Sequence, residues 1–310
     1  MDFPVGTSFY FIILCLVGGY GLARSGVFPV GAHRVLNLLV VYVALPAMVL
    51  IEIPVILQQK TWSVLWMPAL MPWLFFGLSW VFFATIGHLR HWDRRTTGAL
   101  VMTGGLSNTS FVGFPLLEAF YGPQSLATGL IVDQAGSFLV LSSLGTMAAA
   151  YYAGHREDPL RMMGRVVKFP PFLALILACL LTLSGMQWPI KSYLGRFADL
   201  LIPLALLSVG TQLGWEWASI RCRLRTVALG LGWKLVLGPA VIFWIYWHGF
   251  GHQTEEVKIT IAEAAMAPMI TGAIVAMEHG LDSELASLML GLGIPLSLVT
   301  VGGWVYFMNF

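Results

Sequence analysis

The sequence predicts an all-α polytopic membrane protein with ten transmembrane helices, arranged as a 5+5 inverted repeat in which two helices are broken and cross. Three observations predict this fold: the composition, the spacing of the apolar runs and the alternation of basic loops. Of the 310 residues, 58% are hydrophobic and only 10% are charged, whereas an ordinary soluble domain is about 25% charged. A soluble fold of this length could not bury so many apolar side chains away from water. A lipid bilayer accommodates apolar side chains on the protein surface, so the composition predicts a membrane protein.

The apolar runs are each close to the length of about 20 residues that crosses the hydrocarbon core. The ten runs are 7–23, 35–54, 63–87, 97–121, 124–152, 169–187, 192–213, 224–248, 257–279 and 283–308. The connecting loops are short, so we expect no soluble domain. The first run has no basic residues before it and no good cleavage site after it, so we expect a retained helix.

The basic residues alternate between loops. Odd-numbered loops hold twelve of the 17 Lys and Arg residues: Arg24, Arg34, Arg90, Arg94, Arg95, Arg156, Arg161, Arg165, Lys168, Arg221, Arg223 and Arg225. Even-numbered loops hold four, and Lys234 falls inside the eighth run. Because cytoplasmic loops are enriched in Lys and Arg, this predicts a multi-pass protein of the cell membrane, taken to be a bacterial inner membrane, with both termini on the non-cytoplasmic side.

The two halves of the chain resemble each other. We expect five helices in 1–152, a cytoplasmic linker over 153–168 and five helices in 169–310. Matching pairs lie 157 to 159 residues apart: Ser25-Gly26 with Ser184-Gly185, Leu45-Pro46 with Ile202-Pro203, and Gly122-Pro123 with Gly280-Leu281. An odd number of helices in each half makes the repeat inverted, as in many secondary transporters. Chance matches among small residues in apolar sequence remain the alternative.

The fourth run contains a predicted helix break. Asn108, Thr109 and Ser110 precede Gly113 and Pro115. Pro115 cannot donate a backbone hydrogen bond and clashes with the preceding turn, and Gly113 loosens the chain further. The polar side chains can cap freed backbone groups or bind a ligand, and lipid would not tolerate such a break, so we expect it to face protein or a wet cavity.

A second break is predicted at the corresponding place in the ninth run, at Met266, Pro268 and Thr271. Interrupted helices in matching positions of two inverted halves indicate a transport site. The N-terminal ends of half-helices offer unpaired N–H groups and positive dipole ends, which suit an anion such as a carboxylate. The competing interpretation is a pair of proline-kinked packing helices.

Three stretches resemble the auxin efflux carrier family, which includes plant auxin exporters and bacterial permeases for malonate and similar acids. They are Leu36-Asn37 through Leu45-Pro46, the run NTSFVGFP from Asn108, and the run MAPMITGAIVAMEHGLDSELASLMLGLGIPLS from Met266. The resemblance implies a fold related to sodium–bile acid symporters, with the fourth and ninth helices crossing at the site. It also implies a scaffold (1–62 and 169–222) and a mobile transport domain (63–152 and 223–310). The long cytoplasmic loop of many plant exporters is absent.

Ionisable residues at membrane depth are expensive and usually functional. Asp133, beside Gln134, lies inside the fifth run, Lys234 inside the eighth, and Glu263 just before the second break. Burial disfavours the charged form of each group, so our hypothesis is that Asp133 or Glu263 carries a coupling proton and that Lys234 balances charge. A static ion pair that holds helices together is the alternative role for Lys234. Asn37 is expected to form a helix–helix hydrogen bond within the scaffold.

These patterns favour a secondary transporter of small organic anions, auxin-like or malonate-like, in the lipid bilayer, with alternating access about the crossover. A sodium-coupled symporter of the bile-acid type is the alternative, and a channel or receptor remains open. We find no GxSG, GxGD or zincin motif, so we expect no enzyme, no catalytic residues, no metal site and no cofactor. The net charge of +2 gives no reason to expect a nucleic-acid partner. A homodimer through the scaffold helices is left open.

Overall fold

The computed structural model describes residues 5–29, 31–59, 62–154, 164, 167–184, 190–213, 217–251 and 253–309. These residues form helices and turns, with no strand and one isolated β-bridge among them. The predicted all-α class is therefore confirmed. Most of the predicted linker over 153–168 lies outside the described residues.

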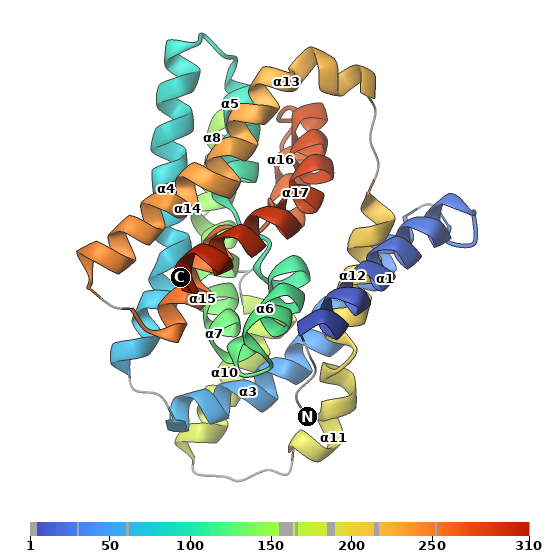
Figure 1. Ribbon diagram of the computed structural model, residues 1–310, viewed down its shortest axis with the longest axis vertical. Coiled ribbons are helices and arrows are strands. Elements are labelled where there is room, and N and C mark those ends of the chain that lie inside the picture. Colours follow the sequence, from blue (N-terminus) through green and yellow to red (C-terminus); the bar gives the residue numbers. More distant parts are fainter. Residues whose placement is uncertain are drawn as a thin grey trace. The chain divides into compact units, whose positions relative to one another are not determined.

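Helical segments lie in every one of the ten apolar runs (Figure 1). Several helices are assembled from consecutive α and π segments. The first half contains α1 (Val5–Arg24), α2 (Ala32–Leu39), η1 (Val40–Ala44), α3 (Leu45–Gln59), α4 (Trp62–Leu89), α5 (Arg94–Gly105), η2 (Thr109–Gly113), α6 (Phe114–Tyr121), α7 (Ser125–Ile131), η3 (Val132–Phe138), η4 (Leu141–Gly145) and α8 (Thr146–Ala153). The second half contains α10 (Pro170–Leu183), α11 (Ile190–Ala198), α12 (Leu201–Gln212), α13 (Trp217–Gly232), η5 (Trp233–Leu237), α14 (Gly238–Phe243), η6 (Trp244–Gly249), α15 (Glu255–Ala264), α16 (Ile270–Glu278) and α17 (Ser283–Asn309).

Six helical stretches of the described chain are long and apolar enough to cross a membrane: Ala32–Gln58, Leu65–Leu89, Ser125–Ala153, Tyr193–Gln212, Arg223–Gly249 and Ser283–Asn309. Two shorter apolar helices are Tyr10–Arg24 and Pro170–Leu183. The fourth and ninth runs are absent from both sets because each is divided into short helices, α5 with α6 and α15 with α16. The protein is thus a polytopic membrane protein.

The chain forms two compact units. Unit 1 consists of Met1–Leu65, Ser110–Leu130 and Val166–Leu213, and unit 2 consists of Trp66–Thr109, Ile131–Arg165 and Gly214–Phe310. The first break of the chain therefore contributes to both units, because the boundary falls between Thr109 and Ser110 inside η2.

Unit 1 brings backbones into direct contact. A Cβ atom added to Gly210 on α12 would lie 2.3 Å from the carbonyl oxygen of Leu16 on α1, and one added to Gly19 would lie 2.3 Å from that of Leu207. Glycine permits this approach, as small residues do wherever membrane helices pack closely. The Ser208 hydroxyl on α12 donates a hydrogen bond to Oδ1 of Asn37 on α2, which confirms the expected helix–helix bond of Asn37.

Unit 2 has an aromatic core around η5. The rings of Phe82 on α4 and Trp233 on η5 stack with centroids 4.0 Å apart. The indole Nε1 of Trp233 donates to the Ser79 hydroxyl over 2.7 Å, and Ser79 donates in turn to the carbonyl of Phe75 over 2.7 Å. Since this indole is buried, the hydrogen bond satisfies its donor and fixes η5 against α4. The next residue on η5 is Lys234.

Candidate functional site

The first helix break lies directly after two glycines. Helix α5 ends at Gly105, Leu106 is extended with φ −111° and ψ 125°, and helical structure resumes at Thr109. A Cβ atom added to Gly104 would lie 2.4 Å from the Phe83 ring, and one added to Gly105 would lie 2.9 Å from the Phe76 ring. The glycines therefore let aromatic side chains of α4 lie directly against the end of α5.

The second break separates α15 from α16. Helix α15 ends at Ala264, and Met269 is extended with φ −71° and ψ 124° before α16 begins at Ile270. Pro268 stands just before this extended residue, in keeping with its inability to donate to a helix ladder. A Cβ atom added to Gly293 on α17 would lie 2.5 Å from the Pro268 ring, so α17 packs tightly behind this break.

The two breaks pair with each other through their backbones. Ser107 and Pro268 form an isolated antiparallel bridge. The Asn108 N–H donates to the Ala267 carbonyl over 2.9 Å, and the Met269 N–H donates to the Leu106 carbonyl over 3.0 Å. Backbone groups released by an interrupted helix need partners away from water, and each break supplies partners for the other.

Lys234 lies where the two breaks meet. Its side chain is fully buried, and its ammonium donates to the Ser107 hydroxyl over 2.8 Å and to the Ala264 carbonyl over 2.8 Å. The same nitrogen lies 4.5 Å from the centroid of the Phe75 ring, within range of a cation–π interaction. One positive charge therefore contacts the polar side chain of the first break and the final carbonyl of the helix before the second.

Asp133 lies on the π-helical segment η3 and contacts the first break. Its buried carboxylate accepts hydrogen bonds from the Thr109 hydroxyl over 2.5 Å and from the Gln134 amide over 2.8 Å. A π-helical turn carries an extra residue and is frequent at functional sites. Lys234 also lies on such a segment, η5, so both charged side chains come from locally widened helices.

Glu263 differs from Asp133 in its hydrogen bonding. It lies in the last turn of α15 and is fully buried, and neither of its carboxyl oxygens has a hydrogen-bond partner among the described residues. Its charge interacts with those of Asp133 and Lys234. The Gln134 carbonyl oxygen and the Ser137 hydroxyl are likewise buried without a hydrogen bond in the described part of the chain. Because an unsatisfied buried carboxylate is costly, this group requires a proton, a cation or a ligand.

The structure gathers some of the predicted site residues but not all of them. Unit 2 contains Asn108, Thr109, Met266, Pro268, Asp133, Gln134, Lys234 and Glu263, which are at the breaks or beside them. Thr271 belongs to the same unit, but its side chain is exposed. Ser110, Gly113 and Pro115 are buried and belong to unit 1.

Two further groups contact Lys234 at the site, the Ser107 hydroxyl and the Ala264 carbonyl. Ser107 stands next to Asn108 in the polar run, so its position was a usable signal. Nothing in the sequence singles out the Ala264 carbonyl, because every residue has a backbone carbonyl group.

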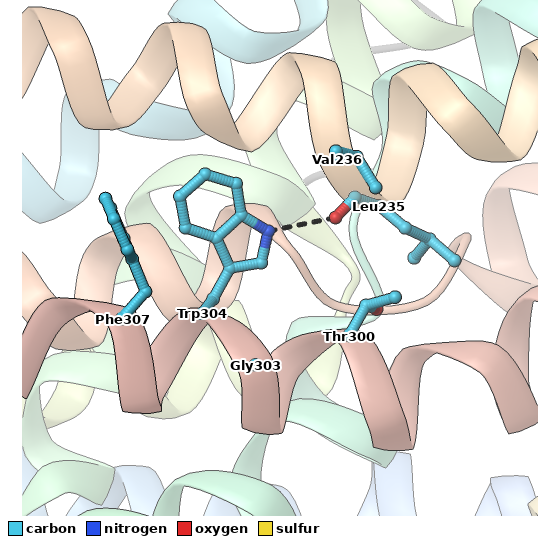
Figure 2. Close-up of a pocket in the computed structure, with 6 residues that line it drawn as sticks. All are labelled: Leu235, Val236, Thr300, Gly303, Trp304 and Phe307. Carbon is cyan, nitrogen blue, oxygen red and sulfur yellow. Dashed lines mark hydrogen bonds between the residues drawn. The ribbon is translucent and has the colours of Figure 1, made fainter.

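A shallow cavity of unit 2 lies away from these charges. It has a volume of about 290 Å³ and is lined by Leu235, Val236, Thr300, Gly303, Trp304 and Phe307. Figure 2 shows the indole of Trp304 donating to the Leu235 carbonyl, over 3.0 Å. None of the described residues that line this cavity carries a charged side chain.

Interrupted helices that meet around buried charged side chains, in a polytopic protein, are typical of membrane transport proteins. The family model described as membrane transport protein matches residues 5–305. The chain belongs to this family, and the resemblance to auxin efflux carriers seen in the sequence is confirmed.

Similar proteins carry transporter names. The chain is 26% identical over 300 residues to an uncharacterized transporter of Methanothermobacter thermautotrophicus, covering 94% of this chain and 95% of that protein. It is 22% identical over 317 residues to the uncharacterized transporter YfdV of Escherichia coli K12, covering 99% of this chain and 98% of that protein. A probable auxin efflux carrier component of Oryza sativa is 31% identical over 101 residues, which cover 33% of this chain and 28% of that protein.

Proposed function

We propose that the protein is a secondary active transporter of small organic anions, such as malonate-like or auxin-like carboxylates, that works by alternating access about the paired breaks. The observation that carries the proposal is the ammonium of Lys234, which is fully buried and hydrogen-bonded to Ser107 and Ala264 at the two breaks. A buried cation at membrane depth is retained for function by default. Here it supplies a positive group at the breaks with which an anion pairs.

The polar and backbone groups of the breaks support the same proposal. Helix α16 begins at Ile270 directly after the second break, and the first N–H groups of a helix favour negative charge. We propose that the substrate contacts the predicted residues of the two breaks: Asn108, Thr109, Ser110, Gly113, Pro115, Met266, Pro268 and Thr271. The apolar Met266 and Pro268 suit the carbon skeleton of such an acid, and Asn108 and Thr109 suit its carboxylate.

Coupling to protons is the second part of the proposal, and the contacts favour Glu263 over Asp133 as the carrier. Two hydrogen bonds to Asp133 stabilise its charged form, whereas the oxygens of Glu263 have none among the described residues. Glu263 therefore gains more from binding a proton. Lys234 interacts electrostatically with Glu263, so protonation of Glu263 changes the charge balance at the breaks.

Sodium coupling is a second candidate, because the same unsatisfied oxygens could bind a cation. Glu263, Gln134 and Ser137 supply buried oxygen atoms without a hydrogen bond in the described part of the chain. Against this candidate, Lys234 already brings a positive charge to the breaks and would repel a second one.

Transport in proteoliposomes tests the proposal. We expect uptake of at least one acid from a panel of mono- and dicarboxylates, driven by a pH gradient without sodium. Glu263→Gln should retain exchange of the acid but lose its response to the gradient, and Asp133→Asn should keep that response. Glu255→Gln, an exposed acid in the first turn of the same helix α15, is the matched control.

Three results would contradict the proposal. No response to any acid in the panel would overturn the organic anion, and an absolute requirement for sodium would favour the second candidate. A full pH response in both acid variants would exclude these residues as the proton carriers.

The membrane topology is a further part of the proposal: ten spans in two inverted halves, with both termini on the non-cytoplasmic side of a bacterial inner membrane. In this arrangement α5 with α6 and α15 with α16 each make one interrupted span. Single cysteines at Arg95 and Gln253, which are both exposed, test it in a variant whose native cysteines are replaced by serine. An impermeant thiol reagent added to intact cells should label Gln253→Cys and not Arg95→Cys, and equal labelling would refute the topology.

A further inference from the structure

A second, strongly basic cavity lies in unit 2. It has a volume of about 950 Å³, and its lining includes Arg90, Trp92, Arg223 and Arg225. These residues come from the turn after α4 and from α13. Among the described residues that line this cavity none is acidic, so their charges are positive.

The three arginines are not equivalent. Arg223 is held by two acids at the start of α17, with its guanidinium 2.5 Å from the Asp282 carboxylate and 3.2 Å from that of Glu284. Arg90 and Arg225 are exposed, and neither forms an ion pair with a described residue. Two guanidinium groups without an acidic partner in the described part of the chain therefore line the same cavity, beside a third that is fixed by its ion pairs.

The positions of the lining residues along their helices show how deep the cavity lies relative to the membrane surface. Arg90 directly follows α4, which ends at Leu89, and Arg223 and Arg225 lie on α13 just before its apolar residues from Val227 onward. The ends of membrane-crossing helices lie at the level of the lipid headgroups, where tryptophan side chains such as Trp92 are enriched. Basic pockets between membrane helices at this level bind acidic headgroups, and guanidinium groups match phosphate oxygens with paired hydrogen bonds.

We propose that Arg90, Trp92 and Arg225 form a binding site for the phosphate group of an anionic phospholipid, with Arg223 positioning α13 beside it. The two free guanidinium groups bind the phosphate, and the indole ring packs against the glycerol and upper acyl carbons. This site is distinct from the paired breaks and does not depend on which substrate is transported.

The test uses the full chain purified in neutral detergent and titrated with phosphatidylglycerol. Native mass spectrometry measures the bound lipid, and thermal unfolding measures the stabilisation it gives. We expect binding to weaken roughly fivefold for each arginine replaced in Arg90→Gln/Arg225→Gln. The control Arg24→Gln/Arg34→Gln removes two exposed arginines of another basic loop and should bind the lipid as the unchanged protein does.

Parallel titrations separate the sources of phosphate. Phosphatidylcholine, which is zwitterionic, should bind weakly, and inorganic phosphate at the same concentration should give no comparable shift in the unfolding temperature. An equal shift from inorganic phosphate would replace the lipid by a soluble ion and overturn the assignment. Equal losses in the two double variants would overturn it as well, because they would show a general effect of surface charge.

Discussion

The two units of the chain are stabilised in different ways. In unit 1 the helices α1 and α12 approach until their backbones touch at Gly19 and Gly210, and the neutral pair Asn37 and Ser208 adds a hydrogen bond. In unit 2 the breaks enclose an ammonium and two carboxyl groups. Every charged side chain that is buried among the described residues belongs to unit 2. Contacts between small neutral residues require no desolvation of charge, whereas buried charges are costly and are kept where they have a function.

Replacing Lys234 by Met should have the largest effect. The ammonium contacts Ser107 and Ala264 and interacts with the charge of Glu263. Removing one member of a buried, hydrogen-bonded charged group costs about 3–5 kcal/mol, so the unfolding temperature in detergent should fall steeply and transport should be lost. Lys258→Met is the control, because Lys258 is only partly buried and bonds Asn309 near the helix end. Equal stability of the two variants would show that the buried contacts of Lys234 contribute no more to unit 2 than the exposed contact of Lys258.

The double variant Lys234→Met/Glu263→Gln tests whether the two buried side chains of unit 2 stabilise each other. If the two charges compensate each other, removing both should destabilise the protein by less than the sum of the single changes. Strict additivity would show that the two side chains act independently.

Gly210→Ala should have an intermediate effect, confined to unit 1. The added methyl group meets the carbonyl oxygen of Leu16 at 2.3 Å, and backbone cannot give way as a flexible side chain can. Overpacking of this kind costs about 1–3 kcal/mol, measured as a lower unfolding temperature. Gly21→Ala is the matched control on α1, since a Cβ atom there meets nothing within 4 Å. A control as unstable as Gly210→Ala would contradict the close packing of α1 and α12.

Ser208→Ala should have the smallest effect of the three. It removes the neutral hydrogen bond to Asn37 and the longer contacts of the same hydroxyl with the His33 carbonyl and the Gln212 amide; a neutral hydrogen bond is worth about 1 kcal/mol in proteins generally. Unfolding of the variant in detergent should therefore shift slightly, with transport retained. A loss as large as that of Lys234→Met would show that unit 1 also depends on a polar network.

The helices could be predicted from the sequence because the bilayer leaves few alternatives. Lipid cannot satisfy backbone N–H and C=O groups, so each long apolar run must be helical. The breaks were predictable only in part. Pro268 stands beside the second break as expected, but the first break lies between Gly105 and Thr109. The prediction that Gly113 and Pro115 interrupt the helix was wrong, because they lie where η2 continues into α6, and proline is tolerated in the first turn of a helix. The π-helical segments were not predicted, because one extra residue in a turn leaves no mark in apolar sequence.

The site was predictable as a set of residues but not as a set of contacts. Asp133, Lys234 and Glu263 stood out because charge is rare in such runs. Their partners depend on which helices pack together, so nothing in the sequence linked Lys234 to Ser107, or Asp133 to Thr109. Thr271 follows the second break closely in the sequence, but the structure exposes its side chain.

The backbone bridge between Ser107 and Pro268 has a consequence for folding. The two residues are about 160 positions apart, and contacts that close so long a stretch of chain form slowly and after local structure. The first break therefore has no partner for its freed backbone groups until the ninth apolar run has entered the membrane. A chain still being synthesised must carry one incomplete helix through most of its insertion, and this interval is when a quality-control protease or a chaperone has most to recognise.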